Sequence, residues 1–185
     1  MDNQKIILAS SSPRRKMLLR KIVDNFEIIQ PSCQEINIYN PQENALQNAI
    51  IKGKSVKDNA FCIIACDTLV ALDGVIYGKP NTKQNAIKTL KILSGKTHSV
   101  FSGVYIKIDQ KEYSFTQESK VKLRKLTNED IISYVNKYLP LDKAGAYGIQ
   151  DDVIVESYSG DYDNIVGLPT DKIREILREY IDVKD

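Results

Sequence analysis

Apolar positions along the chain fall into two patterns, short continuous runs and stripes at helical spacing, which predict strands and helices in turn. The runs KIILA at 5–9 and FEIIQPSC at 26–33 predict strands. Residues 61–80 predict a continuous apolar strand, then a second strand and a return strand. A long antiparallel pair is predicted over residues 98–108 and 111–123.

Turn and capping residues mark the ends of these elements. Ser12 and Asn40 each stand before a proline, which suits the first position of a helix, so helices are predicted from Ser12 to about Val23 and from Asn40 onward. Asp73-Gly74 is a strong signal for a two-residue hairpin. Further helices are predicted over residues 82–94, 127–138 and 169–181, with strand and turn over 151–169. The fold class predicted is α/β, with a mixed sheet, helices on its flanks and two subregions.

Composition and charge exclude several classes of protein. The net charge of the 185 residues is only +2, too small for the bulk cationic field that nucleic-acid binders use. Cys33, Cys62 and Cys66 have only His98 to join them, whereas a zinc site needs four N or S ligands at close spacing. The first apolar run is too short for a signal peptide, and no stretch approaches the length of a membrane span. We therefore predict a reduced, cytoplasmic protein that binds neither nucleic acid nor membrane.

The segment LASSSPRRKMLL at 8–19 places basic residues where a helix normally collects acidic ones. Three serines and a proline lead into a first turn that contains Arg14 and Arg15. Such a helix start offers free N–H groups, hydroxyls and guanidinium donors to a phosphate group. The glycines and lysine of a P-loop are missing. A capped surface helix with solvated arginines explains the same residues, so the segment alone leaves both interpretations open.

Other candidate residues are carboxylates, lysines and an amide. Asp67 follows the run FCIIA, which would deliver its carboxylate to the carboxyl edge of the sheet, where it could bind a metal or activate water. Glu35 could be a second carboxylate for the same metal. Lys52, Lys79 and the glycine-rich AGAYGIQ, which ends in Gln150, could contact a ligand. Each has an ordinary alternative as a turn residue or a solvated side chain.

Six motifs taken together resemble the Maf family. They occur in the family's order and at nearly its spacing, from residue 6 to residue 169, so the resemblance covers almost the whole chain. The motifs are LASSSPRR, CDT at 66–68, GKP at 78–80, LSGKTH at 93–98, PLDKAGAYGIQ at 140–150 and GDYDNIVGLP at 160–169. The resemblance implies a single Maf-like domain over residues 1–185. Its expected fold is a mixed twisted sheet flanked by helices, in two lobes around a central cleft, like the inosine triphosphate pyrophosphatases.

The resemblance also implies an activity and a set of site residues. Members hydrolyse a nucleoside triphosphate between its α- and β-phosphates with a divalent metal, Mg²⁺ or Mn²⁺. Asp67 matches the proton acceptor, and Glu35 and Asp67 would hold the metal. The other residues implied to be catalytic are Arg14, Lys52 and Lys79. The residues implied to bind substrate are Ser10, Arg14, Arg15, Thr68 and Gln150.

Three of these positions indicate a branch of the family. Arg15, Thr68 and Gln150 match the members that hydrolyse dTTP and UTP rather than 7-methyl-GTP. The expected function is housecleaning of the nucleotide pool by hydrolysis of dTTP, UTP or modified pyrimidine triphosphates, and the family suggests a homodimer. The alternative is a nucleotide-binding regulator of cell division and septum formation with little turnover. Such a sensor would need Arg14 and Arg15, but not both carboxylates and both lysines.

Overall fold

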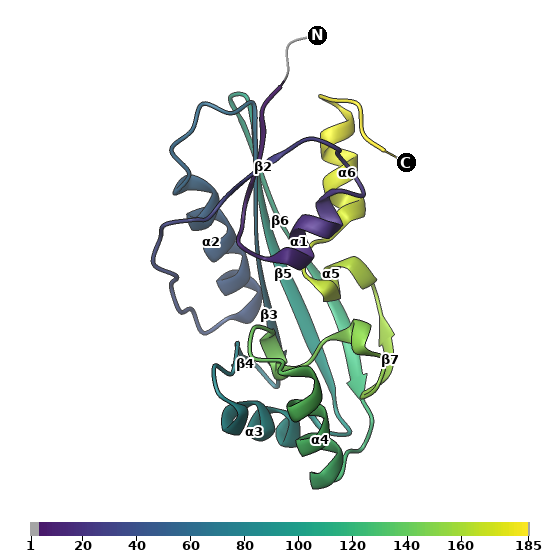
Figure 1. Cartoon of the computed structure of the whole chain (residues 1–185). Coiled ribbons are helices and arrows are strands. Elements are labelled where there is room, and N and C mark those ends of the chain that lie inside the picture. Colours follow the sequence, from purple (N-terminus) through teal and green to yellow (C-terminus); the bar gives the residue numbers. More distant parts are fainter. Residues whose placement is uncertain (1–3, 185) are drawn as a thin grey trace.

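The computed structural model describes residues 4–184 and shows one mixed sheet with helices on both of its faces (Figure 1). The strands are β1 (Ile6–Ala9), β2 (Glu27–Ile29), β3 (Cys62–Leu72), β4 (Val75–Tyr77), β5 (Thr97–Ile108), β6 (Lys111–Leu123) and β7 (Val155–Ser159). The α-helices are α1 (Pro13–Leu19), α2 (Pro41–Lys54), α3 (Lys83–Leu93), α4 (Asn128–Tyr138), α5 (Tyr162–Val166) and α6 (Thr170–Arg178). Two short 3₁₀ turns are η1 (Ala144–Ala146) and η2 (Ile149–Asp151).

The order of strands confirms the mixed sheet expected from the sequence. Across the sheet the order is β2-β1-β3-β5-β6-β7, and β4 pairs with the far end of β3. β1 runs parallel to β2 and to β3, and the other paired strands are antiparallel. The parallel pairs are joined by crossovers that contain α1 and α2. Two antiparallel pairs, β3–β4 and β5–β6, are joined by short turns, and the other two by segments that contain α3 or α4.

β3 has a free edge in its middle. Its first residues pair with β1 as far as Ala65, and its last residues pair with β4 from Val70 onward. Between these two neighbours, residues 66–69 pair only with β5 on the opposite side. Asp67 and Thr68 lie in this interval, where β3 has no neighbouring strand on the side of β1 and β4.

Alternate residues of the central strands pack against different helices, because successive side chains of a strand point to opposite faces. α2 covers one face, and α1 and α6 cover the other (Figure 1). The residues that pack with α2 are Ile7, Ala9, Ile63, Ala65 and Tyr105, and those that pack with α1 and α6 are Ile6, Leu8, Ile64, Val104 and Ile106. β1 and the first five residues of β3, 62–66, are apolar without interruption because both of their faces are covered.

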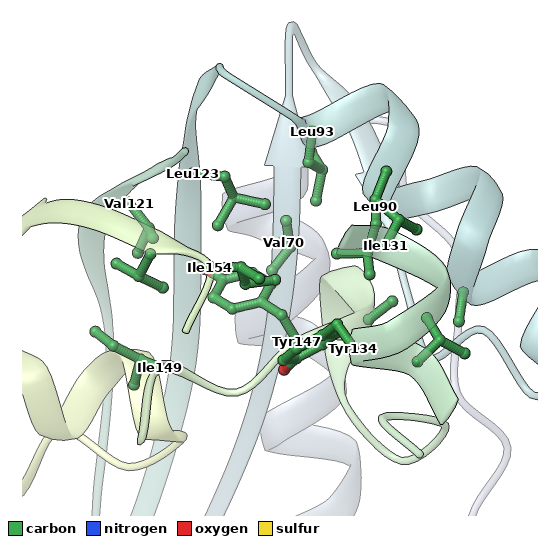
Figure 2. Packing of buried hydrophobic residues seen from close by; sticks show 14 of the residues in the cluster. Val70, Leu90, Leu93, Val121, Leu123, Ile131, Tyr134, Tyr147, Ile149 and Ile154 are labelled. Carbon is green, nitrogen blue, oxygen red and sulfur yellow. The ribbon is translucent and has the colours of Figure 1, made fainter. Parts of the chain in front are cut away.

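A second core lies at the other end of the long strands, under α3 and α4 (Figure 2). Val70 of β3 and Leu90 of α3 pack there with Ile131 and Tyr134 of α4. Tyr147, which follows η1, joins the same cluster and is 5% exposed. The chain segment that carries Tyr147 is therefore fixed by packing at this end of the molecule.

Most element boundaries agree with the capping signals. The side chains of Ser12, Asn40, Thr82 and Thr127 each accept a backbone N–H in the first turn of the helix that follows. Asp73 and Gly74 both have positive φ, 51° and 78°, as a two-residue hairpin between β3 and β4 requires.

Three predictions were wrong in extent or type. α1 ends at Leu19 rather than near Val23, although Ile22 and Val23 continue the apolar stripe, because a turn carries them into the same core. The two strands predicted before the Asp73-Gly74 turn are one strand, β3, and Asp67 lies inside it rather than at its end. Residues 162–166, predicted as turn, form α5, which begins at Asp161, whose side chain accepts two backbone N–H groups.

No helix in the described part of the chain combines the length and the apolar character needed to span a membrane.

One buried histidine should make the fold less stable in acid. His98 is 2% exposed, and its Nε2 atom lies 2.8 Å from the hydroxyl oxygen of Tyr147. Burial lowers the pKa of His98 from 6.5 to about 4. Between these values the unfolded chain binds a proton that the folded chain does not. Its contribution to stability is therefore complete above pH 6.5 and is lost as the pH falls toward 4, by on the order of 3 kcal/mol.

Urea unfolding of the wild type and of His98→Gln at a series of pH values across this window checks the prediction. His98 is the only histidine in the sequence, so the wild-type free energy of unfolding should fall through the window and that of the variant should change much less. Equal slopes for the two proteins would contradict the assignment.

Candidate active site

A cleft of about 350 Å³ lies where β3 has its free edge. Its volume is in the range that small-molecule sites in proteins occupy. The walls come from the end of β1 and the start of α1, the segment after β2, α2, the middle of β3, and the chain around η1 and α5. Of the site residues predicted from sequence, the cleft is lined by Ser10, Arg14, Arg15, Glu35, Lys52, Thr68 and Lys79.

The serines and arginines at the start of α1 form one wall. The Ser10 hydroxyl accepts the backbone N–H of Ser12 at 3.1 Å, and the Ser12 hydroxyl accepts that of Arg15 at 3.4 Å. These two hydrogen bonds fix the turn between β1 and α1, and Arg14 and Arg15 of α1 line the cleft. α1 has only seven residues, so the two guanidinium groups, rather than the helix end, supply most of the positive charge on this wall.

Arg14 reaches across the cleft to the opposite wall. Its Nη1 atom lies 2.6 Å from a carboxylate oxygen of Asp142, and its Nη2 atom donates to the Asp142 carbonyl at 3.2 Å. Lys143 contacts the same carboxylate at 3.0 Å. Burial alone would raise the pKa of Asp142, but the bonds from Arg14 and Lys143 outweigh it and lower the pKa to about 2. Asp142 is therefore negatively charged at neutral pH and forms an ion pair with Arg14.

Arg15 is held more firmly, by groups on the cleft floor. Its Nε atom donates to the Gly167 carbonyl at 2.9 Å, and its Nη2 atom donates to the Thr68 hydroxyl at 3.1 Å. Both partners are fixed in turn, because Thr68 is in β3 and Gly167 ends α5. The guanidinium plane therefore has a defined orientation in the cleft.

Lys52 joins two carboxylates that come from distant parts of the sequence. Its Nζ atom lies 2.7 Å from Glu35 and also bonds to Asp67. Lys52 and Asp67 are mostly buried, with side chains 13% and 15% exposed, whereas the Glu35 side chain is 60% exposed. The cluster therefore sets one ammonium group directly against two carboxylates, and Lys79 and Arg15 add positive charge near Glu35.

The charges in this cluster shift one another's pKa. Hydrogen bonding to Lys52 lowers the pKa of Glu35, with smaller contributions from the charges of Lys79 and Arg15. Burial acts to lower the pKa of Lys52, but the charge of Asp67 and the bonds to both carboxylates outweigh it, and the net shift is upward. Lys52 is therefore charged at neutral pH even though it is largely buried.

Two glycine contacts set the position of Lys52. α2 lies so close to the sheet that a Cβ atom on Gly53 would be 2.1 Å from the Tyr105 ring, and one on Gly103 would be 2.2 Å from the Ala45 carbonyl oxygen. Gly53 follows Lys52 directly in α2, and Gly103 pairs with Asp67 across β5 and β3. The same close approach therefore brings the Lys52 ammonium to the Asp67 carboxylate.

Two predicted residues have less direct positions. Asp67 is reached from the cleft through Lys52, which lines it. Gln150 is exposed and lines a separate hollow together with Tyr158 and Tyr162. Its neighbours Gly148 and Ile149 line the main cleft, so Gln150 lies near the rim and not on the wall. Its role in substrate binding stays a prediction.

Several cleft residues were not selected from the sequence. Asp142 and Lys143 occur in the motif PLDKAGAYGIQ, but nothing in their spacing showed that they face Arg14 across the cleft. The apolar part of the lining was also missed, because its residues look like ordinary core positions. These residues are Val70, Val100, Tyr147, Ile149, Ile165 and Val166. The cleft thus has a cationic part and an apolar part, as a ligand with a charged chain and a flat ring would need.

Comparison with known proteins places the chain in a family. A family model described as "Maf-like protein" matches residues 5–180. The chain belongs to the Maf family. A dTTP/UTP pyrophosphatase of Carboxydothermus hydrogenoformans is 45% identical, over 95% of this chain and 98% of its own. Those of Clostridium novyi and Bacillus anthracis are 42% and 41% identical, over 94% and 97% of this chain and 96% and 98% of their own.

The fold expected for a Maf protein is also confirmed. The Ham1 protein of Staphylococcus aureus aligns with a TM-score of 0.57 over 96% of this chain and 100% of that chain. At 18% sequence identity this likeness concerns the fold alone. The six sequence motifs that resembled the Maf family thus identified both the family and the sheet architecture.

Proposed function

We propose that this Maf protein is a nucleoside triphosphate pyrophosphatase that hydrolyses dTTP and UTP to the nucleoside monophosphate and pyrophosphate. Relatives with 41–45% identity over nearly the whole chain carry that name. The structural observation that carries the proposal is the cleft that Arg14, Arg15, Lys52 and Lys79 line, in which Lys52 is bonded to the carboxylates of Glu35 and Asp67. This combination suits a polyanionic substrate that must also be attacked by water.

The cationic part of the cleft would bind the triphosphate. Arginine side chains grip phosphate oxygens with several N–H donors at once, and lysines add point charges. On binding, the phosphates would replace the Asp142 carboxylate as the partner of Arg14, because both are anions that compete for the same guanidinium group. Ser10 adds a hydroxyl at the base of this wall.

Glu35 and Asp67 are suited to hold the divalent metal that the family implies. Their oxygens are the ligands that Mg²⁺ and Mn²⁺ prefer, and both carboxylates converge on the Lys52 ammonium group. Among residues 4–184 no group of three or more His, Cys, Asp or Glu side chains is placed to hold a metal ion, so these two carboxylates are the ligands that we propose the chain would supply. A bound metal would polarise the phosphate and neutralise charge on the leaving pyrophosphate.

Asp67 would act as the proton acceptor. Water attacks the α-phosphorus, its proton passes to the Asp67 carboxylate, and the bond from the α-phosphorus to the bridging oxygen breaks. Pyrophosphate leaves with that electron pair. Lys52 keeps Asp67 in place, and Arg14, Arg15 and Lys79 stabilise the negative charge that develops on the departing group.

The apolar part of the cleft would hold the base and sugar. Tyr147 and the aliphatic side chains around it provide a surface for a flat ring. Arg15 and Thr68 lie where the two parts of the cleft meet, and they match the positions that distinguish the dTTP and UTP branch. A regulator that only senses nucleotides would have no need of the buried Lys52–Asp67 pair, so the cleft favours an enzyme.

A panel of canonical and modified nucleoside triphosphates, each assayed for pyrophosphate release with Mg²⁺ and with EDTA, tests the proposal. We expect metal-dependent release from dTTP and UTP, with a nucleoside monophosphate as the second product. A preference for 7-methyl-GTP would overturn the substrate assignment. Binding without any turnover would favour the regulator.

A further inference from the structure

Behind the cleft floor, a short series of hydrogen bonds connects Arg15 to the interior of the sheet. Thr68 and Ser102 face each other on β3 and β5, and their hydroxyl oxygens are 2.8 Å apart. Thr68 Oγ1 also lies 3.2 Å from the Gly167 carbonyl, and Ser102 Oγ lies 3.3 Å from the Asn164 carbonyl. Together with the Arg15 guanidinium, these groups form what we call the Thr68 network.

Counting protons shows that Thr68 is almost fully engaged within this network. A hydroxyl has one proton to donate and two lone pairs to accept with, and a guanidinium only donates. Arg15 therefore takes one lone pair of Thr68. If Ser102 donates to Thr68, the second lone pair is taken as well, and the Thr68 proton goes to Gly167. If instead Thr68 donates to Ser102, the Ser102 proton goes to Asn164, and one lone pair of Thr68 stays free.

The direction of the Ser102 proton thus decides what Thr68 can offer to a ligand. In the first arrangement Thr68 helps to bind Gly167, which is also the acceptor for Arg15 Nε, and it has no capacity left for substrate. In the second it can accept one hydrogen bond from substrate. In both arrangements Thr68 accepts a hydrogen bond from Arg15. The network uses two of the five N–H donors of Arg15, and the Arg15 side chain lines the cleft.

We propose that Ser102 is a positioning residue for substrate discrimination, which acts through Thr68 on the orientation of Arg15. This inference rests on the proposed function and deepens it. Ser102 is 0% exposed and is absent from the cleft lining, so it has no route to the substrate itself. Its far partner is also fixed, because the Asn164 side chain donates to Val100 and to Ser119 at 3.3 and 2.9 Å. The two hydroxyl protons are therefore the strong adjustable donors of the network, and beside them lies the Cys66 thiol, a weak donor whose Sγ atom is 3.8 Å from Thr68 Oγ1 and 3.3 Å from the Gly167 carbonyl.

Four variants of the full chain separate this role from a structural one. Ser102→Ala removes the hydroxyl, and Ser102→Thr retains it. Thr68→Val removes the Thr68 hydroxyl while keeping its shape, and it is also combined with Ser102→Ala. The matched control is Ser119→Ala, a buried serine of β6 that bonds to Asn164 and Asp161 but to neither Thr68 nor Arg15. The measured quantities are the ratio of kcat/KM for UTP to that for CTP, the ratio of their Kd values in EDTA, and Tm.

We expect Ser102→Ala to lower the UTP to CTP ratio by about 2- to 10-fold, the range that one hydrogen bond is worth, and Ser102→Thr to restore it. Thr68→Val should lower the ratio similarly, and adding Ser102→Ala to it should cause no further fall, since both act through one hydroxyl pair. Ser119→Ala should lower Tm and leave the ratio unchanged. If Ser102→Ala does not fold, Ser102→Cys, a poorer donor of similar size, takes its place.

Other outcomes overturn the proposal. A Ser102→Ala protein that loses Tm but keeps the wild-type ratio would show a structural role only, as would a double variant whose losses add. If the wild type binds UTP and CTP with equal affinity, there is no discrimination to which Ser102 could contribute, and the proposal is refuted. The Kd ratio depends on binding and not on turnover, so a chain that binds both nucleotides and hydrolyses neither would refute the proposed function while the effect of Ser102 is still measured.

Discussion

Asp67→Asn should reduce kcat for UTP and dTTP by about 10²–10³-fold, the loss that follows removal of one charged or hydrogen-bonding group from a preorganised site. The substitution keeps the shape of the side chain but removes the charge that bonds to Lys52 and the group proposed to accept the proton of the attacking water. It also removes one of the two carboxylates suited to the metal. Arg14, Arg15 and Lys79 are untouched, so binding of the triphosphate in EDTA should persist.

Steady-state assay of pyrophosphate release, with nucleotide affinity measured separately by titration, checks this expectation. The control is Asp58→Asn, which removes another carboxylate that bonds to a lysine, Lys5, at a distance of 2.8 Å and away from the cleft lining. Its turnover should equal that of the wild type. Turnover of Asp67→Asn within a few-fold of the wild type would exclude Asp67 as the proton acceptor.

Gly103→Ala should destabilise the fold by about 4 kcal/mol, near the upper end of what single substitutions cause. A Cβ atom at this position would lie 2.2 Å from the Ala45 carbonyl oxygen, 2.3 Å from the Ala45 carbonyl carbon and 2.5 Å from the Leu46 nitrogen. All three are backbone atoms in the middle of α2, so no side chain can rotate to make room. Either the helix moves off the sheet or the backbone of β5 distorts.

Urea unfolding of Gly103→Ala and of Gly78→Ala measures the difference. Gly78 is the matched control, because nothing lies within 4 Å of the Cβ atom it would gain and its φ is not left-handed. Its free energy of unfolding should change by less than about 0.5 kcal/mol. Since α2 carries Lys52, any folded Gly103→Ala protein should also lose turnover. If the free energy of unfolding of Gly103→Ala is close to that of the wild type, α2 does not lie in close contact with β5 at Gly103.

Gly53 and Gly103, which let α2 lie close to the sheet, illustrate a part of the site that could not be predicted from the sequence. The Asp73-Gly74 turn could be predicted from the sequence, but Gly103 lies inside a strand of regular appearance. A glycine is needed at this position because the backbone of α2 at Ala45 lies against it, and Ala45 is some sixty positions earlier in the chain. In the same way, the local sequence offered Arg14 as a candidate anion ligand and left a solvated side chain as the alternative, whereas its partner Asp142 is 128 residues away.

The sequence by itself determined the elements and the family. The signals that marked the elements each involve only a few neighbouring residues, so they can be read from local sequence. They are the capping residues such as Ser12 and Thr127, the Asp73-Gly74 turn and the apolar runs in β1 and β3. Six ordered motifs identified the Maf family for the same reason, since each is short and continuous.

Only the tertiary structure decided how these parts meet. It made β3 one continuous strand with a free edge at residues 66–69, because its pairing with β1 stops at Ala65 and its pairing with β4 begins at Val70. It brought Glu35 and Asp67 onto Lys52, placed Gln150 outside the cleft wall, and connected Thr68 to Ser102. These arrangements depend on the register of strands and on the close packing of a helix against a sheet. Both are set by contacts between residues far apart in the chain, which no local pattern records.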